Sequence, residues 1–280
     1  MEKKVKLVKK VKRLLKRLGC PRWLHHFGPK TYEFYEHLVA LLVREYCRLS
    51  YRRVKYLLDM FGFACPSKSA LQYTSRKIPK WMWEAALLAT SGVKHYLVAL
   101  DSTGFARTNP SYHYLRRIDG KMPKVHVKLS VAFDTRKKKF CAARIRVLPR
   151  HDSKDAKYLV QKSNPNIVIA DKAYNSEGLY GYSYDNNILL MSPKKKNAKR
   201  GYYRKKMQKQ FRTRTYNRRQ LVESGFGAMK RTEGSSVSSK KAKTIRAELY
   251  CKMVTYNLFY CLFRLLGQSR LFYINFTCCS

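Results

Sequence analysis

Three acidic side chains stand where this sequence could place reactive carboxylates. The apolar run 97–100 (LVAL) leads directly into Asp101, and the run 167–170 (IVIA) leads into Asp171. In open α/β sheets, sites form outside the carboxyl ends of central strands. An aspartate after a strand is also a common turn or cap residue. Because the chain has only 17 acidic residues, two aspartates in this position favour one shared site over two separate turns.

The third carboxylate, Glu223, lies in a segment whose pattern predicts a helix beginning at about residue 214. Tyr216, Arg219, Glu223 and Lys230 fall within about 60° of one another at 100° per residue. Val222, Phe226 and Met229 form the neighbouring stripe and are expected to pack on a sheet. A surface ion pair between Arg219 and Glu223 would explain two of these residues but not the whole stripe.

Three carboxylates in one place raise one another's pKa and repel unless cations join them. Hard divalent cations such as Mg²⁺ prefer oxygen ligands and keep positions open for water and phosphate. A pair of such ions about 3.5–4 Å apart can activate an attacking oxygen and stabilise the leaving one. The pattern therefore predicts metal-dependent chemistry on a phosphodiester.

The charge of the chain indicates the same substrate. Lys and Arg number 60, and the formal net charge is +43 in 280 residues. Like charges oppose compaction unless a polyanion neutralises them, and basic side chains displace counterions from nucleic-acid phosphates. A ribosome or an anionic membrane surface would satisfy the charge equally, but neither explains the carboxylates. A metal-dependent enzyme acting on nucleic acid is the class that composition and spacing favour.

The cysteines and the apolar runs bear on the compartment. None of the eight cysteines forms a CxxC pair, so a zinc ribbon or finger is not expected. No apolar run follows the basic N-terminus as a secretory signal requires. The most apolar stretch, 254–266, is shorter than the ~20 residues of a membrane span. We expect a cytoplasmic, nucleoid-associated protein with reduced thiols.

These motifs resemble a known family. The sequences DSTG at 101–104 and ADKAYNS at 170–176, together with the Tyr–Arg–Glu–Lys set, are similar to those of insertion-sequence DDE transposases. The set at 216, 219, 223 and 230 matches the YREK signature of insertion sequence families four and five. The resemblance covers residues 95–262. It implies a ribonuclease H-like fold in which Asp101, Asp171 and Glu223 bind two Mg²⁺ or Mn²⁺ ions.

The resemblance also implies an activity. Such enzymes nick double-stranded DNA at the terminal inverted repeats of an element, and the freed 3′-hydroxyl then attacks target DNA. Tyr216, Arg219 and Lys230 would be catalytic-site residues that contact DNA near the scissile phosphate. A homodimer is expected in the DNA complex because two ends must be synapsed. The short interval between Asp171 and Glu223 indicates that the β-rich insertion of some relatives is missing.

The remaining pattern predicts the elements that position these residues. Helical periodicity marks 1–18, 32–46 and 80–90, and a strand-like period begins at His95. Strands are expected near 95–103, 124–134, 140–148, 167–170 and 188–193, with a helix after Asp152 and helices from about 214 and 243. Asp152 and Asp155 resemble a capping box. The basic or Ser-rich blocks 193–206 and 235–243 are expected to be loops. The pattern predicts an α/β or α+β domain preceded by an all-helical one. With the resemblance, this implies an α/β fold class with a helical DNA-binding domain at 1–92 and a ribonuclease H-like DDE catalytic domain at 93–280.

The segment 50–76 has the features of a helix-turn-helix. Ser50 can cap a helix that ends near Met60, a glycine turn follows, and Pro66 with Ser67 can begin a second helix. That helix offers Lys68, Ser69, Gln72 and Arg76 as DNA contacts, since these side chain types read base edges and bind phosphate. An ordinary helical hairpin has the same pattern, and the overall charge favours DNA binding.

Other residues receive structural interpretations. His95, His113, His126 and His151 lack the spacing of metal ligands. Asp134 and Asp152 are expected to cap a turn and a helix, respectively. Tyr112, Tyr114, Tyr202 and Tyr203 are expected to pack in the core or lie at the surface rather than to stack on nucleic-acid bases. Gly225 and Gly227 interrupt the proposed helix and would permit a close approach of DNA or sheet. Two other functions stay open: a ribonuclease H-like nuclease without strand transfer, and a domesticated DNA-binding protein derived from a transposase.

Overall fold

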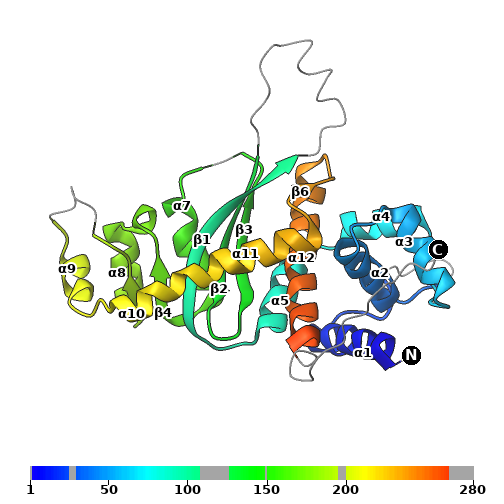
Figure 1. Ribbon diagram of the computed structural model, residues 1–280, viewed down its shortest axis with the longest axis horizontal. Helices are drawn as coiled ribbons and strands as arrows, with labels where there is room; N and C mark the ends of the chain where they lie inside the picture. The colour runs from blue at the N-terminus through cyan, green and yellow to red at the C-terminus, as the bar shows by residue number, and fades with distance from the viewer. Residues whose placement is uncertain (1, 25–29, 108–125, 149, 195–199, 265–280) are drawn as a thin grey trace, which may run out of the picture.

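The computed structural model describes residues 2–24, 30–107, 126–148, 150–194 and 200–264. The predictions for Tyr112, His113 and Tyr114 lie outside this part of the chain. A central sheet lies between two sets of helices, and the N-terminal helices gather at one end (Figure 1). These are α1 (Glu2–Arg17), α2 (Phe34–Tyr46), α3 (Tyr51–Met60), α4 (Lys68–Lys77) and α5 (Lys80–Ser91). None of the described helices is long and apolar enough for a membrane span.

The sheet has the strand order β3-β2-β1-β4-β5. Its strands are β1 (His95–Arg107), β2 (Val127–Asp134), β3 (Lys139–Arg146), β4 (Pro165–Ala170) and β5 (Leu189–Met191). The first three strands are antiparallel, whereas β1, β4 and β5 are parallel. This mixed sheet with flanking helices confirms the predicted α/β fold class.

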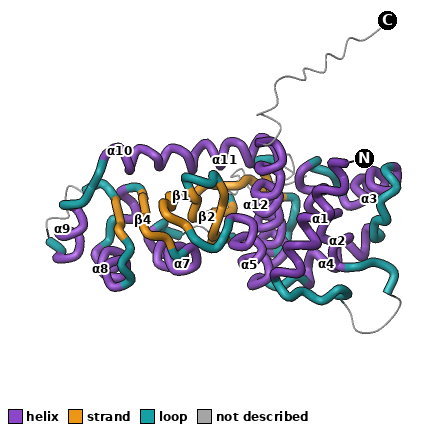
Figure 2. The backbone as a smooth tube through the Cα atoms, turned by 90° about the horizontal axis from the view of Figure 1, so that it is seen from below, coloured by secondary structure: helices purple, strands orange, loops and turns teal. Residues whose placement is uncertain are grey.

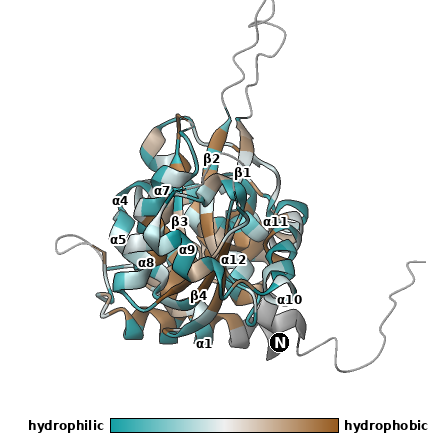
Figure 3. Cartoon of the chain, turned by 90° about the vertical axis from the view of Figure 1, so that its left-hand side faces the viewer, coloured by the Kyte–Doolittle hydropathy of each residue, from teal (hydrophilic) through white to brown (hydrophobic). Residues whose placement is uncertain are grey.

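Helices cover both faces of the sheet. The later elements are α7 (Ser153–Ser163), η1 (Lys172–Tyr174), α8 (Glu177–Asp185), α9 (Tyr202–Gln208), α10 (Thr213–Tyr216), η2 (Asn217–Arg219), α11 (Gln220–Glu233), β6 (Ser236–Val237) and α12 (Ala242–Arg264). Figure 2 shows α10 and α11 along one side of the sheet and α7 and α8 on the other. Alternate residues of β1 enter the two cores: Leu97 and Ala99 face the α11 side, and Val98 and Leu100 face α7 and α8. The strands are accordingly the most apolar part of the interior (Figure 3).

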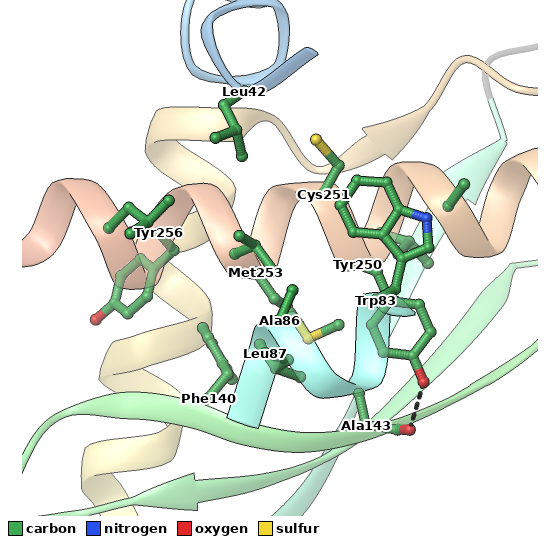
Figure 4. Close-up of a cluster of buried hydrophobic side chains, with 14 of the residues drawn as sticks. Leu42, Trp83, Ala86, Leu87, Phe140, Ala143, Tyr250, Cys251, Met253 and Tyr256 are labelled. Atoms are coloured by element: carbon green, nitrogen blue, oxygen red, sulfur yellow. Dashed lines mark hydrogen bonds between the residues drawn. The ribbon is translucent and has the colours of Figure 1, made fainter. Parts of the chain in front are cut away.

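The core on the α11 side continues from the sheet into the N-terminal helices. Figure 4 shows Leu42 of α2 and Trp83 of α5 around Met253 of α12. The Tyr250 hydroxyl donates to the Ala143 carbonyl at 2.9 Å. The Asn257 side chain accepts from the Phe140 amide at 3.0 Å and donates to its carbonyl at 2.7 Å, so α12 is tied to β3 by polar bonds as well as by apolar contact.

The local signals at the N-terminal end are confirmed. Ser50 accepts from the Arg53 amide at 3.2 Å and begins α3, and Ser67 accepts from the Ala70 amide at 3.2 Å and begins α4. Gly62, at φ 61°, makes the turn after α3. The predicted basic amphipathic helix is α1, and it buries Val11 and Leu14 in the core.

Several predictions need correction. The block 193–206, expected as loop, contains the start of α9, because Met207 buries its side chain against α8. The block 235–243 contains β6, which pairs with the far end of β1. Helix α8 was missed altogether. Its sequence EGLYGYSYD has weak helix propensity, and burial of Leu179 and Tyr180 supplies the stability instead.

The predicted capping box before α7 is wrong. The Asp152 side chain makes no cap hydrogen bond and instead accepts from the Ser102 hydroxyl at 2.8 Å and pairs with Lys128. Asp155 is fully buried, where it accepts from Arg146 at 2.8 Å and from Ser130 at 3.1 Å. Asp134 does cap its turn, since it accepts the amides of Arg136 and Lys137.

Gly225 lets α11 approach the sheet. A Cβ at Gly225 would lie 2.7 Å from the Phe133 ring, whereas a Cβ at Gly227 would meet nothing within 4 Å. The Phe133 ring is buried and packs edge-on against Phe140, with ring centroids 5.1 Å apart. It therefore cannot swing away at low cost.

We predict opposite effects of alanine at the two glycines. Gly225→Ala should lower the free energy of unfolding by about 1–3 kcal/mol through overpacking. Gly227→Ala should raise it by up to about 1 kcal/mol, because alanine favours helix. Urea denaturation of both variants measures the difference. Equal stabilities would show that α11 does not approach β2 this closely.

Candidate functional site

Parallel pairing of β1 with β4 brings the two aspartates together. Leu100 is the register partner of Ala170, so Asp101 and Asp171 follow at the same level of neighbouring strands. Strand β4 ends there, and the Asp171 side chain accepts from the Lys172 amide at 2.6 Å at the start of η1. Strand β1 is longer than predicted: it does not end near Thr103 but extends to Arg107. It continues beside β2, with Phe105 opposite Val127.

The helix that carries Glu223 lies across the sheet. Val222, Phe226 and Met229 of α11 are buried in the core, as predicted. The predicted single helix is divided, however. Tyr216 ends α10, Arg219 lies in the tighter η2 turn, and Glu223 and Lys230 belong to α11. The run is nevertheless continuous, so all four side chains lie along its length.

Arg219 joins two of the three acids. Its guanidinium donates to Asp101 Oδ2 at 3.3 Å and pairs with Glu223 Oε1 at 2.9 Å. The ordinary ion pair between Arg219 and Glu223 is therefore present, but it extends to a residue of the central strand. Asp101 has 20% of its side chain exposed and Glu223 has 56%, so the cluster opens to solvent on the helix side.

The electrostatics of Asp101 reflect its acidic neighbours. Burial raises the pKa of the Asp101 carboxyl above its usual range, and the charges of Glu223 and Asp171 raise it further. The Ser102 amide and Arg219 act in the opposite direction without cancelling these effects. Burial also raises the pKa of Tyr216, and Asp171 and Asp101 add to that effect. The three carboxylates and Tyr216 thus share one electrostatic environment.

Lys230 forms hydrogen bonds between α11 and the part of β1 that follows Asp101. Its Nζ donates to Thr103 Oγ1 at 2.7 Å and to the Gly104 carbonyl at 2.9 Å. Burial lowers the pKa of Lys230. All six residues predicted for the site therefore lie on the sheet strands and helical run that meet here.

The three acids offer suitable ligands for metal ions, but Arg219 occupies the space between two of them. Within the described ranges, no three His, Cys, Asp or Glu side chains are gathered closely enough to hold a metal, because Arg219 lies between Asp101 and Glu223. The donor set itself suits a hard cation, since all three groups offer carboxylate oxygens. The pKa of Asp101 stays raised chiefly because its carboxyl is buried, although the Ser102 amide and Arg219 lower it. The residues fit divalent ions provided that Glu223 exchanges Arg219 for metal.

A fourth acid near the site was missed by the sequence analysis. Ser102, next to Asp101, donates its hydroxyl to Asp152, which also pairs with Lys128. The buried Tyr174 lies close by, and its pKa is raised by burial and by Asp152 and Asp101. By accepting the Ser102 hydroxyl, Asp152 helps to position the neighbouring Asp101. The apparent capping pattern concealed this role, and only the fold brings residues 102 and 152 together.

The predicted DNA contacts lie on α4. Lys68, Ser69, Gln72 and Arg76 are exposed, whereas Leu71, Thr74 and Ser75 on the other side of the helix are buried. Helix α4 lies at the opposite end of the molecule from α8 and α9 (Figure 1).

Comparisons with known proteins give a family match. Residues 93–258 match the family described as transposase DDE domain. No curated protein matches the sequence significantly. Among solved structures, the chain is similar to a piggyBac transposase synaptic complex with hairpin DNA, with a TM-score of 0.40 and 10% identity over 89% of this chain and 72% of that chain. It is also similar to a Mos1 transposase paired-end complex with the left transposon end, with a TM-score of 0.24 and 12% identity over 89% and 85%.

We predict that Arg219→Gln raises the pKa of Asp101 further. Arg219 lowers that pKa at present, so its removal leaves burial and two negative neighbours opposed only by the Ser102 amide, and the carboxyl will keep its proton to higher pH. Carboxyl carbon chemical shifts recorded across a pH titration measure the change. Arg218→Gln, an exposed neighbour, is the matched control. An Asp101 titration that moves equally in both variants would contradict the bridging role of Arg219.

Proposed function

Since this chain belongs to the transposase DDE domain family, we propose that it is a DNA transposase that cleaves phosphodiesters at element ends and joins the 3′ ends to target DNA. The observation that carries the proposal is the meeting of Asp101 and Asp171 at one level of β1 and β4, with Glu223 joined to Asp101 through Arg219. The spacing of Tyr216, Arg219, Glu223 and Lys230 supports a place among insertion sequence families four and five.

Asp101, Asp171 and Glu223 would hold two Mg²⁺ or Mn²⁺ ions. Such ions supply activation of the attacking oxygen and stabilisation of the leaving oxygen. The protein contributes the frame: β1 and β4 fix two carboxylates rigidly, and the half-exposed Glu223 can change rotamer on α11. If Glu223 exchanged Arg219 for a metal ion, Arg219 would keep Asp101 as a partner and could also bind a phosphate oxygen through its planar guanidinium.

The basic and phenolic side chains would position DNA beside the carboxylates. Tyr216 lies in the same electrostatic environment as Asp171, and its hydroxyl can donate to a phosphate oxygen. Lys230 is held by Thr103 and Gly104, so its charge is fixed next to β1 rather than mobile. A charge fixed in advance stabilises a developing oxyanion without reorganisation at the moment of reaction.

The partners follow from the same proposal. Residues 1–92 would bind the terminal inverted repeats, residues 93–280 would cut and join, and two copies would synapse two DNA ends. A net charge of +43 is suited to this polyanion. The working location would be the cytoplasm, in association with the nucleoid. A domesticated DNA-binding protein is less well supported, because all three acids of the triad are present.

We predict that Glu223→Gln abolishes cleavage of DNA ends in Mg²⁺ while DNA binding persists. Loss of one carboxylate should slow the metal-dependent step by roughly 10³-fold or more, about 4 kcal/mol of barrier. The assay is Mg²⁺-dependent nicking of a labelled duplex that carries the element's inverted repeat, scored also for strand joining.

The matched control is Asp185→Asn, which removes an exposed acid at the end of α8 and should leave the rate unchanged. Cleavage by Glu223→Gln at the wild-type rate would refute the catalytic assignment. Cleavage without strand joining by the wild-type protein would assign the chain to the nucleases.

We predict two different effects on α4. Gln72→Ala should reduce discrimination between the inverted repeat and unrelated DNA by about 1–3 kcal/mol, because glutamine reads a base edge. Arg76→Ala should weaken binding to all sequences and lower the salt slope by about one, because it binds phosphate. Fluorescence anisotropy at several salt concentrations separates them. Unchanged binding in both variants would show that α4 is an ordinary core-packing helix.

A further inference from the structure

A cavity of about 670 Å³ lies beside α10, at the sheet end away from the N-terminal helices. Its floor is the face of the parallel strands that α11 leaves uncovered: Leu97, Ile167, Leu189 and Met191. Ile167 and Leu189 are only partly buried, so apolar surface remains accessible there. This end of the molecule, with β4, α9 and α10, faces the viewer in Figure 3.

The rim of the cavity is strongly basic. Five cations line it: Arg136, Lys209, Arg212, Arg214 and Arg218. No acidic side chain is among the described residues that line it, and all five cations are exposed. Five positive charges around a hollow without a counter-charge raise the local concentration of anions. The occupant must therefore carry several negative charges.

Aromatic rings join the rim to the floor. Tyr96 is 47% exposed, and the Arg136 guanidinium lies 3.8 Å from its ring centroid. Phe211 also lines the cavity and packs against Tyr216 with ring centroids 5.4 Å apart. Rings and apolar side chains between cations are the combination that binds unpaired bases while the cations follow the phosphates. A duplex keeps its bases stacked inside and would leave this floor unused.

The cavity continues the proposed catalytic site along one helical run. Thr215 and Arg218 line it, and Tyr216 and Arg219 beside them face the acids. At about 1.5 Å of rise per residue, Arg214 lies roughly 15 Å before Glu223. At 3.4 Å per base step, this corresponds to roughly four nucleotides along a strand.

We propose that this cavity, lined by the five cations above and by Tyr96 and Phe211, binds an unpaired DNA strand that leads away from the scissile phosphate. The inference rests on the proposed function and adds a substrate form to it: DNA whose strands are separated a few nucleotides from the cut. The cations hold the backbone, and the apolar floor receives bases without reading their sequence.

The test compares binding of a twelve-nucleotide oligothymidine with binding of a blunt duplex of the same length, by fluorescence anisotropy in buffer without divalent ions. Arg212→Gln/Arg214→Gln/Arg218→Gln should lower affinity for the single strand and reduce its salt slope by about two. The matched control, Lys154→Gln/Lys157→Gln/Lys162→Gln on the exposed side of α7, removes the same charge from the other side of the sheet and should retain most of the single-strand affinity.

A second variant tests the aromatic part. Tyr96→Ala should weaken single-strand binding roughly 5- to 100-fold and leave duplex binding unchanged. Two outcomes would overturn the proposal. The first is that the rim variant and the control variant lose affinity equally for the single strand and for the duplex. The second is that Tyr96→Ala changes the sedimentation of the protein but not its affinity for DNA. In either case, retained Mg²⁺-dependent end cleavage would leave the proposed function intact. Failure of the wild-type protein to bind either probe would refute both.

Discussion

The site depends on the parallel hydrogen-bonded pairing of β1 with β4. Leu100 opposite Ala170 is the contact that sets Asp101 beside Asp171, and a slip by one residue would turn one aspartate to the other face of the sheet. The register is fixed by burial on both sides, since Val98 and Val168 enter one core while Ala99 and Ile169 enter the other. Two carboxylates that repel each other are therefore held together by apolar packing that neither of them contributes to.

The charge of the site shows how a protein with 60 basic residues keeps an acidic centre. Arg219 compensates Asp101 and Glu223 at once, yet the pKa of Asp101 stays raised because burial and two acidic neighbours outweigh it. An incompletely compensated centre retains affinity for a further cation. Under the proposed function, the surrounding positive charge would attract DNA and the acidic centre would attract metal ions, so substrate and metal would be drawn by opposite charges of the same protein.

The sequence predicted what depends on local pattern and failed where the tertiary structure decides. Apolar runs located β1 and β4, serine caps located α3 and α4, and the stripe of Val222, Phe226 and Met229 placed α11 on the sheet. The extension of β1 beyond Thr103 could not be foreseen, because it rests on pairing with β2 rather than on a run of apolar residues. Asp152 was misassigned for the same reason: its partners Ser102 and Lys128 are distant along the chain. The assignment of site roles remains a prediction.

Hydrogen bonds fix both ends of α11, the helix that carries Glu223, and one of them comes from the N-terminal part of the chain. Arg48, just after α2, donates to the Thr232 carbonyl at 2.9 Å and so satisfies the C-terminal end of α11, where a positive charge also complements the helix dipole. Leu42 of α2 and Met253 of α12 belong to the same apolar core as Phe226. Because Arg219 binds at the start of α11, and Lys230 and Arg48 bind at its last turn, a displacement of the N-terminal helices would alter the position of α11. The geometry of the three acids therefore rests on the packing of the whole chain, and not on the sheet alone.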